Sequence, residues 1–235
     1  MISIGSLILK KILLSSIIFL ALLGCKSEID LPVKYSQIFG KPQPSTGTLS
    51  IEVPDCKEEA TEMESSSVLE AKQKVSYIFS GAKYLGCKGE GFESFVSFEV
   101  PFKIGGVGMR DCRKNEICVA SSQNNQNMNV FVGEEIRKKI TLIARGSTFF
   151  DPDNLRITLT VDNDSGQSLS VRIPSAFLRH EGEEIPLHNT RGGNFPEDTL
   201  KFTLSNVASA QLIRGRGVAT AMEFPDREYV APPYK

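Results

Sequence analysis

The stretch LRITLTVDNDSGQSLSVRI, residues 155–173, carries the pattern from which we predict the structure of the C-terminal half of the chain. From Leu155 to Val161 apolar and polar residues alternate, which is typical of a strand with one buried face. Asn163-Asp164-Ser165-Gly166 supplies residues that tight turns favour, and the alternation resumes at Leu169. The stretch therefore predicts a β-hairpin.

Short strands with turn signals between them continue through this half of the chain. We expect them at residues 176–180, 184–187, 200–204 and 217–223. Several short strands at regular spacing are the pattern of a β-sandwich. We predict a small β-sandwich-like domain over residues 147–226, followed by a tail of residues 227–235.

The N-terminal half combines one clear helix with strands. Ser67 and Glu70 fit a capping box, and apolar residues then recur every three or four positions up to Phe79. A shorter helix is expected from Gly133 onward. The expected strands cover residues 49–53, 82–87, 92–102, 117–120 and 128–132. The order β-α-β-β predicts a domain over residues 47–146, so the expected fold class is α+β, with this domain followed by the sandwich.

The first 25 residues resemble an export signal. Two lysines precede an apolar run, residues 12–23, that is too short for a membrane span of about 20 residues. The run ends in Leu22-Leu23-Gly24-Cys25, which resembles a bacterial lipobox. The resemblance implies a signal peptide of residues 1–24, cleavage before Cys25, and acyl chains such as palmitate on that cysteine. The alternative is an uncleaved anchor helix whose cysteine is accidental.

A lipid on Cys25 fixes where we expect the protein. Two or three acyl chains on one residue anchor a protein durably, whereas one chain does so only marginally. We therefore expect a lipoprotein of the cell envelope, with the membrane as one partner and the proline-containing residues 25–46 as a tether. Inner-membrane retention in enteric bacteria resembles an aspartate after the cysteine, so Lys26 favours the outer membrane in a Gram-negative host.

Four further cysteines are available for disulfides: Cys56, Cys87, Cys112 and Cys118. An exported chain forms disulfides by default, and four cysteines allow three connectivities. A hairpin can close the short loop between Cys112 and Cys118, which favours that pair and leaves Cys56 to bond with Cys87. A zinc site is the alternative, but these spacings include no CxxC pair and no histidine lies near.

Charge and motifs exclude several classes of function. Without residues 1–24 the chain loses Lys10 and Lys11 and no acids, so its 27 basic and 28 acidic residues become 25 and 28, a net charge of −3. Such a chain is no polycation, and we expect no nucleic-acid partner. No nucleophile motif or tuned pair of carboxylates is present. We therefore predict no catalytic residue, no cofactor and no enzyme activity.

The two histidines, His180 and His188, are the remaining candidates for chemistry. On paired strands they could face each other beside Glu181, Glu183 and Glu184, a set that would suit a metal ion. We favour a charged hairpin loop with two exposed histidines, and so predict no metal site.

Four segments together resemble an uncharacterised family of small lipoproteins from bacteria and some of their phages. They are LLGCKSEIDLPVKYSQI, GTLSIEVPDC, VSYIFSGAKYLGC and NDSGQSLSV. The resemblance brings no activity, ligand or catalytic residue. The phage association implies that some members are made by prophages and alter the surface of the host.

These features predict a lipid-anchored, non-enzymatic protein of the cell envelope with a protein-binding or structural role at the membrane surface. Its expected partners are the membrane, through Cys25, and an envelope protein. One alternative is a prophage-encoded surface modifier that masks a phage receptor or excludes superinfecting phage. The second is an envelope metal-binding protein or hydrolase that uses His180 and His188.

Overall fold

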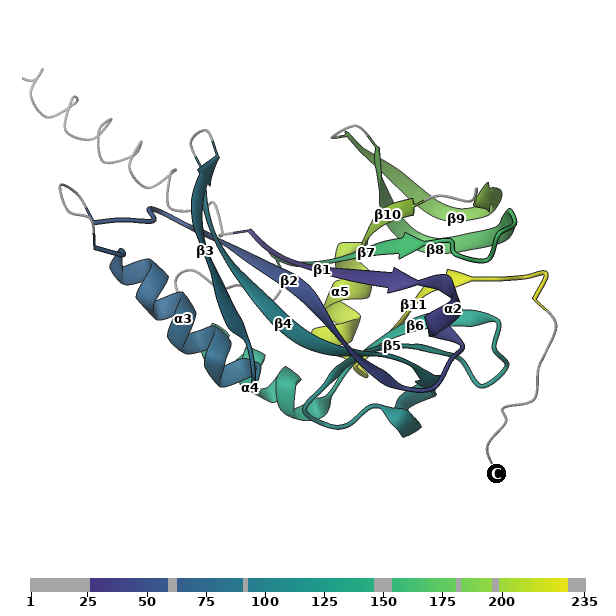
Figure 1. The fold of residues 1–235 in the computed structure, drawn as a ribbon, viewed down its shortest axis with the longest axis horizontal. Coiled ribbons are helices and arrows are strands. Elements are labelled where there is room, and N and C mark those ends of the chain that lie inside the picture. Colours follow the sequence, from purple (N-terminus) through teal and green to yellow (C-terminus); the bar gives the residue numbers. More distant parts are fainter. Residues whose placement is uncertain are drawn as a thin grey trace, which may run out of the picture.

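Nine strands of the chain pair around a closed ring, so that they form a barrel (Figure 1). The computed structural model describes residues 26–58, 63–90, 93–145, 154–180, 183–195 and 199–227. The ring runs in the order β10-β7-β1-β2-β4-β5-β6-β11-β8 and closes through a β8–β10 pairing. Two more strands flank it, β3 beside β4 and β9 beside β8. The strands are β1 (Ser27–Lys34), β2 (Gln43–Val53), β3 (Lys83–Glu90), β4 (Glu93–Val107), β5 (Ile117–Ser121), β6 (Asn127–Val132), β7 (Leu155–Asp162), β8 (Leu169–His180), β9 (Glu183–Phe195), β10 (Thr199–Leu204) and β11 (Val218–Glu223).

This architecture contradicts the predicted fold class. The α+β domain of residues 47–146 and the sandwich-like domain of residues 147–226 are not separate bodies, because one sheet contains strands from both. β1 pairs in parallel with β7 from Ser27↔Leu155 to Lys34↔Asp162, and β6 pairs antiparallel with β11. The two predicted halves therefore form one mainly β structure.

The predicted tether, residues 25–46, belongs to the sheet from Ser27 onward. β1 lies between β2 and β7, a short helix α2 (Tyr35–Ile38) follows it, and β2 begins at Gln43. The proline that suggested a linker, Pro32, lies beyond Asp30, where the β1–β2 register ends. Proline lacks a backbone N–H, and it is tolerated there because β1 has a partner strand on only one side.

Three helices pack on the apolar side of this sheet. They are α3 (Ser66–Ile78), α4 (Glu134–Ala144) and α5 (Asn206–Ile213). α3 begins two residues earlier than the capping box predicts, because Ser65 is its N-cap and the Ser65 Oγ accepts a hydrogen bond from the Val68 N–H at 3.3 Å. A short 3-10 helix, η1 (Gly108–Asp111), follows β4. Among the described residues no helix is both long and apolar enough to cross a lipid bilayer.

Alternation along β1 gives the sheet two unlike faces. Ile29, Leu31 and Val33 are at most 2% exposed and belong to the hydrophobic core, which the apolar residues of α3, α4 and α5 complete. Glu28 and Asp30 point to the opposite side and are half-buried. A strand with period-two alternation separates its side chains in this way. The core therefore lies on one side of β1, and a polar surface lies on the other.

Two disulfides tie loops to the sheet. Cys56, just after β2, bonds to Cys87 in β3, and Cys112 bonds to Cys118 in β5. This is the connectivity that the sequence analysis favours.

Candidate functional site: a charged cleft beside β1

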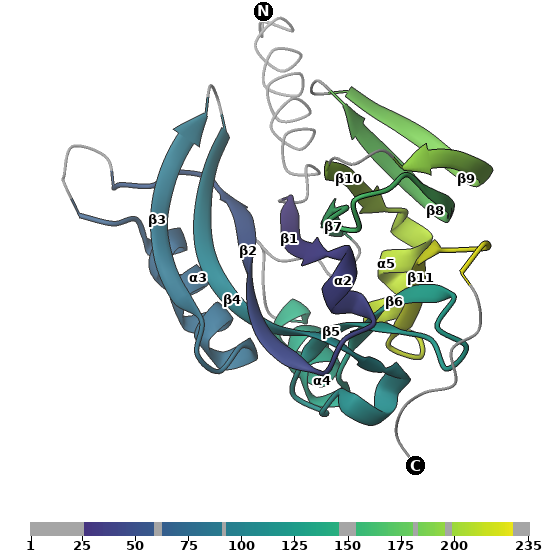
Figure 2. The ribbon, with the colours of Figure 1, turned by 45° about the vertical axis from the view of Figure 1, so that its right-hand side comes forward.

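The polar side of β1 borders a cleft of about 480 Å³. In Figure 2, β3 and β4 rise on one side of β1, and β8 and β9 rise on the other. Pockets that bind small molecules typically have volumes of about 300–1,000 Å³, so the cleft is large enough for a ligand. Its lining comes from seven strands and the residue before β1: Lys26, Ser27, Glu28, Asp30, Thr48, Ser50, Lys88, Phe95, Ser97, Arg156, Arg179 and Lys201.

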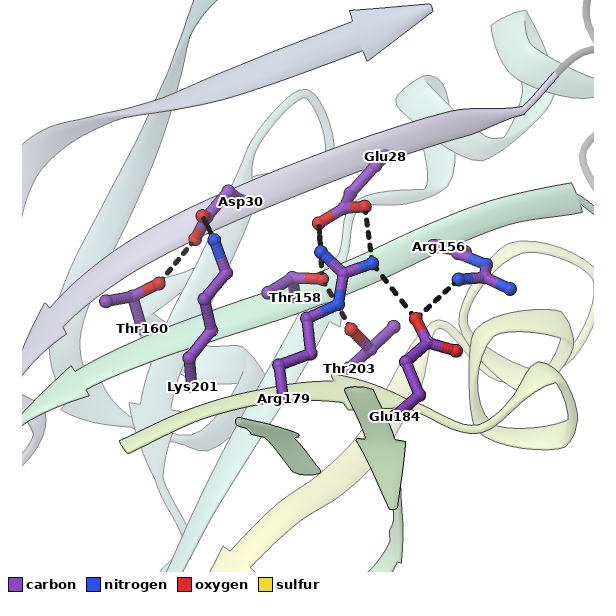
Figure 3. Close-up of polar contacts among 9 residues, drawn as sticks. All are labelled: Glu28, Asp30, Arg156, Thr158, Thr160, Arg179, Glu184, Lys201 and Thr203. Atoms are coloured by element: carbon purple, nitrogen blue, oxygen red, sulfur yellow. Dashed lines mark hydrogen bonds and ion pairs between the residues drawn. The ribbon is translucent and has the colours of Figure 1, made fainter. Parts of the chain in front are cut away.

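The strands β1, β7 and β10 form what we call the floor of the cleft. Arg179 of β8 reaches across this floor to β1 (Figure 3). Its Nη1 and Nη2 donate to the two carboxylate oxygens of Glu28 at 2.8 and 2.9 Å. Nη2 also donates to the Oε1 of Glu184 in β9 at 3.1 Å, and the Nη1 of Arg156 in β7 donates to the same oxygen at 2.7 Å. We call these four side chains, Glu28, Arg156, Arg179 and Glu184, the Arg179 network. It joins the β8–β9 hairpin to the strands of the floor.

Threonine hydroxyls complete the bonding of Glu28. The Oγ1 of Thr158 donates to the Oε1 of Glu28 at 2.8 Å and lies 2.8 Å from the Oγ1 of Thr203. Because the Thr158 proton goes to the carboxylate, the Thr203 hydroxyl donates to Thr158. Both threonines are at most 1% exposed, so their polar atoms need these partners.

Asp30 forms a second, parallel set of contacts. The Nζ of Lys201 in β10 donates to Asp30 Oδ2 at 2.6 Å, and the Oγ1 of Thr160 donates to Asp30 Oδ1 at 2.8 Å (Figure 3). Both carboxylates of the floor are therefore bound by a cation and by a threonine hydroxyl.

Two cations of the cleft, Arg179 and Lys26, have a raised pKa. Partial burial lowers the pKa of Arg179, but the Glu28 charge and hydrogen bonds, followed by Glu184, outweigh it and raise that pKa. The hydrogen bond to Glu93 raises the pKa of Lys26, although burial and the nearby Arg156 cation oppose the rise. Both side chains are cations at neutral pH, and the arrangement suits charge recognition.

Three cations gather at the end of the cleft where β1 begins. Lys26 precedes β1, Lys88 comes from β3, and Arg156 is the second residue of β7. Lys26 Nζ contacts Glu93, and its backbone N–H donates to the Oε2 of Glu52 at 2.9 Å. We call Lys26, Lys88 and Arg156 the rim cations.

The residues predicted for chemistry lie elsewhere. Cys25 lies outside the described residues, directly before Lys26. Register pairs His180 with Glu183 and His188 with Ser175, which places the two histidine backbones five residues apart along β8, about 16 Å. The strands therefore do not set the histidines opposite each other. Their side chains and Glu181 lie outside the described part of the chain.

The cysteines do not offer metal ligands. Glu116 lies with Cys112 and Cys118 in a group whose ligand atoms are within 4.8 Å of one another. The two sulfurs are bonded to each other, whereas a metal binds the thiolate form.

Sequence reasoning missed the cleft residues. Arg156, Thr158 and Thr160 are identified only as the polar alternates of a strand, and Glu28 and Asp30 fall in the predicted tether. The signal that could have found Glu28 and Asp30 is the alternation with Ile29 and Leu31.

A comparison with protein families matches residues 27–225 to a domain of unknown function, DUF7424. No curated protein and no solved structure is similar enough to the chain to match it. The match extends from the first residue of β1 to two residues beyond β11, and so covers the whole ring and every cleft residue except Lys26. The chain belongs to the DUF7424 family.

Proposed function

We propose that this protein is a lipid-anchored, non-enzymatic protein of the bacterial cell envelope that binds another envelope protein at the membrane surface. The observation that carries the proposal is the position of β1. Its first residue, Ser27, is two positions after Cys25, and consecutive Cα atoms are about 3.8 Å apart. An anchor on Cys25 thus lies within about 8 Å of the sheet.

The disulfides support export. Cys56–Cys87 and Cys112–Cys118 use all four cysteines after Cys25. Disulfides persist in oxidising compartments such as the periplasm and the cell surface and are rare in the cytosol. An exported protein with an apolar run before a lipobox-like cysteine fits an envelope lipoprotein.

Exposed apolar side chains support a protein partner. Large hydrophobic residues with 37–64% exposure gather on α3, α4, β3 and the segment before α3: Met63, Leu69, Tyr77, Tyr84, Leu85 and Leu142. Lys72 of α3 lies over the ring of Tyr84, and Lys139 of α4 lies over the ring of Tyr77, so these elements are neighbours. Aromatic residues and methionine are enriched at protein interfaces.

The anchor is tested by metabolic labelling with a palmitate analogue, followed by membrane fractionation. Wild-type protein is expected to carry the label and to sediment with membranes, and Cys25→Ser is expected to lose the label. The matched control replaces Cys112 and Cys118 by serine, which removes two cysteines but keeps the lipobox. An unlabelled wild-type protein, or label that persists in Cys25→Ser, rejects the anchor.

The partner is tested by crosslinking in intact envelopes and purification of the adducts. One protein is expected to be recovered with wild type and to be reduced by Leu85→Asp on β3. The control is Val207→Asp on α5, a side chain that is 80% exposed and belongs to another helix. Recovery of bulk lipid alone, or equal loss in the two variants, contradicts this part of the proposal.

A further inference from the structure

We propose that the end of the cleft next to Cys25 binds the phosphate of an anionic lipid headgroup in the bilayer that holds the anchor. The inference rests on the proposed function for its orientation. Its chemistry rests on the cleft itself.

The two floor carboxylates do not oppose an anion. Glu28 is bound by both guanidinium nitrogens of Arg179, and Asp30 is bound by Lys201. Each negative charge is therefore compensated by a cation within 3 Å, and threonine hydroxyls occupy part of their remaining acceptor capacity.

The rim cations are available to a phosphate. Lys88 is exposed, and its side chain forms no hydrogen bond or ion pair with a described residue. Lys26 and its partner Glu93 are 60% and 42% exposed, and Arg156 and its partner Glu184 are 42% and 32% exposed. Ion pairs this exposed contribute little net stability, so a phosphate can take the place of the carboxylates.

Neutral donors lie at the same end of the cleft. The hydroxyls of Ser50 in β2 and Ser97 in β4 line it and are 3.3 Å apart. Ser50 is directly opposite Glu28 across the β1–β2 pair, and Arg156 is directly opposite Glu28 across the β1–β7 pair. Hydroxyls beside guanidinium and ammonium groups are the usual donor set for phosphate oxygens.

The composition of the cleft favours the headgroup rather than the acyl chains. Phe95 is the one large apolar side chain among its twelve lining residues. One phenylalanine ring is too small a surface for acyl chains, which would stay in the bilayer. Because Lys26 follows Cys25 directly, the rim cations lie next to the residue that carries the anchor. Basic residues at an anionic membrane surface bind it electrostatically.

The test is native mass spectrometry of the full lipoprotein, purified in a non-ionic detergent. Dioleoylphosphatidylglycerol, dioleoylphosphatidylcholine and soluble glycerol 1-phosphate are added separately. Wild type is expected to retain phosphatidylglycerol in preference to phosphatidylcholine. Lys88→Ala and Arg156→Ala are each expected to weaken that retention about fivefold. Lys88→Ala removes a side chain with no described partner, so it leaves the fold intact.

The matched control is Lys138→Ala on α4. Lys138 is 73% exposed and ion-paired with Glu134, and α4 lies on the apolar side of the sheet, away from the cleft. Equal retention of the two lipids, or equal weakening by Lys138→Ala and Lys88→Ala, overturns the inference. Binding of glycerol 1-phosphate without a preference between the lipids overturns the assignment to a lipid headgroup.

The same spectra separate this inference from the proposed function. The intact mass reports whether Cys25 carries a diacylglycerol. An anchored protein with no preference for the anionic lipid rejects the headgroup site alone. A chain without the diacylglycerol rejects the anchor, whichever lipid it retains.

Discussion

Replacing Arg179 by methionine tests whether the Arg179 network holds the β8–β9 hairpin on the floor of the cleft. Methionine keeps most of the side-chain length and removes the charge. Arg179 and Glu28 are 27% and 26% exposed. Breaking a fully buried ion pair costs about 3–5 kcal/mol, and an exposed pair contributes at most about 1 kcal/mol. At this partial exposure we expect a loss of about 2 kcal/mol in the free energy of unfolding.

The assay is thermal unfolding of the purified protein. A loss of about 2 kcal/mol in a domain of this size lowers Tm by about 4–8 °C. The loss comes from stranding the Glu28 charge, so adding Glu28→Gln to Arg179→Met should recover part of it. The exposed pair of α4 is the control, and Lys138→Met should change Tm little, because exposed ion pairs contribute little net stability. An Arg179→Met variant no less stable than Lys138→Met, or a double variant less stable than Arg179→Met, refutes the reasoning.

Three further predictions concern stability. Replacing both cysteines of Cys56–Cys87 by serine should lower the free energy of urea unfolding by about 4 kcal/mol, because that disulfide closes a loop of 31 residues. The same change at Cys112–Cys118, which closes a loop of 6 residues, should lower it by about 2 kcal/mol. A larger loss for Cys112–Cys118 than for Cys56–Cys87 contradicts the loop-entropy argument. Burial raises the pKa of Asp164, but hydrogen bonds from the hydroxyl and the backbone N–H of Ser36 in α2 outweigh burial and lower that pKa. The stabilisation that Asp164 contributes is present above its unfolded pKa of about 3.9 and is lost as pH falls through its folded pKa. Asp164→Asn removes this loss, so Tm should fall less steeply between about pH 5 and pH 3. An unchanged slope would refute this. Gly106→Ala should lower the free energy of urea unfolding by about 3 kcal/mol, and Gly166→Ala should lower it by about 1 kcal/mol. Both glycines have positive φ, but of the two only Gly106 would place a Cβ within 3 Å of other atoms. Equal losses would contradict the steric explanation.

The sequence predicts individual elements better than their assembly. The strands that begin at Leu155 and Leu169 lie where alternation places them, because alternation is a local signal. The β-hairpin predicted from them is wrong, because β7 and β8 do not pair with each other and β10 pairs with both. α5 was missed, since Ser205 gives an N-cap but only eight residues follow before the helix ends. β1 was missed because Pro32 suggested a linker. The pairings of β1 with β7 and of β6 with β11 have no local signal at all, and these pairings join the halves.

The cleft could not be predicted from sequence for the same reason. Thr158 lies 130 residues from Glu28, Arg179 lies 151 residues from it, and Lys201 lies 171 residues from Asp30. Each of these polar residues occupies the outward position of its own strand, where a solvent-exposed side chain is the usual outcome. The pairing of β7 with β1 and β10 brings Thr158 and Lys201 beside the two carboxylates. The β8–β10 pairing, which closes the ring, adds Arg179. The Cys112–Cys118 disulfide could be predicted, because its two cysteines are only six residues apart in the sequence.

The proposed anchor on Cys25 lies two residues before β1, which borders the cleft, so an anchored protein would have a defined orientation. A flexible linker of about 20 residues would have an end-to-end distance of about 25 Å, well beyond the Debye length of about 8 Å at physiological salt. With Cys25 lipidated as proposed, the two-residue connection keeps Lys26 and its neighbours within about one Debye length of the headgroups. Attraction between the rim cations and the membrane should then weaken as salt is raised. The bonds between Arg179 and Glu28 are less sensitive to salt, because they are direct, 2.8–2.9 Å long, and partly buried. Salt therefore distinguishes this ion pair, which holds strands together, from the more exposed rim cations that we propose face the bilayer.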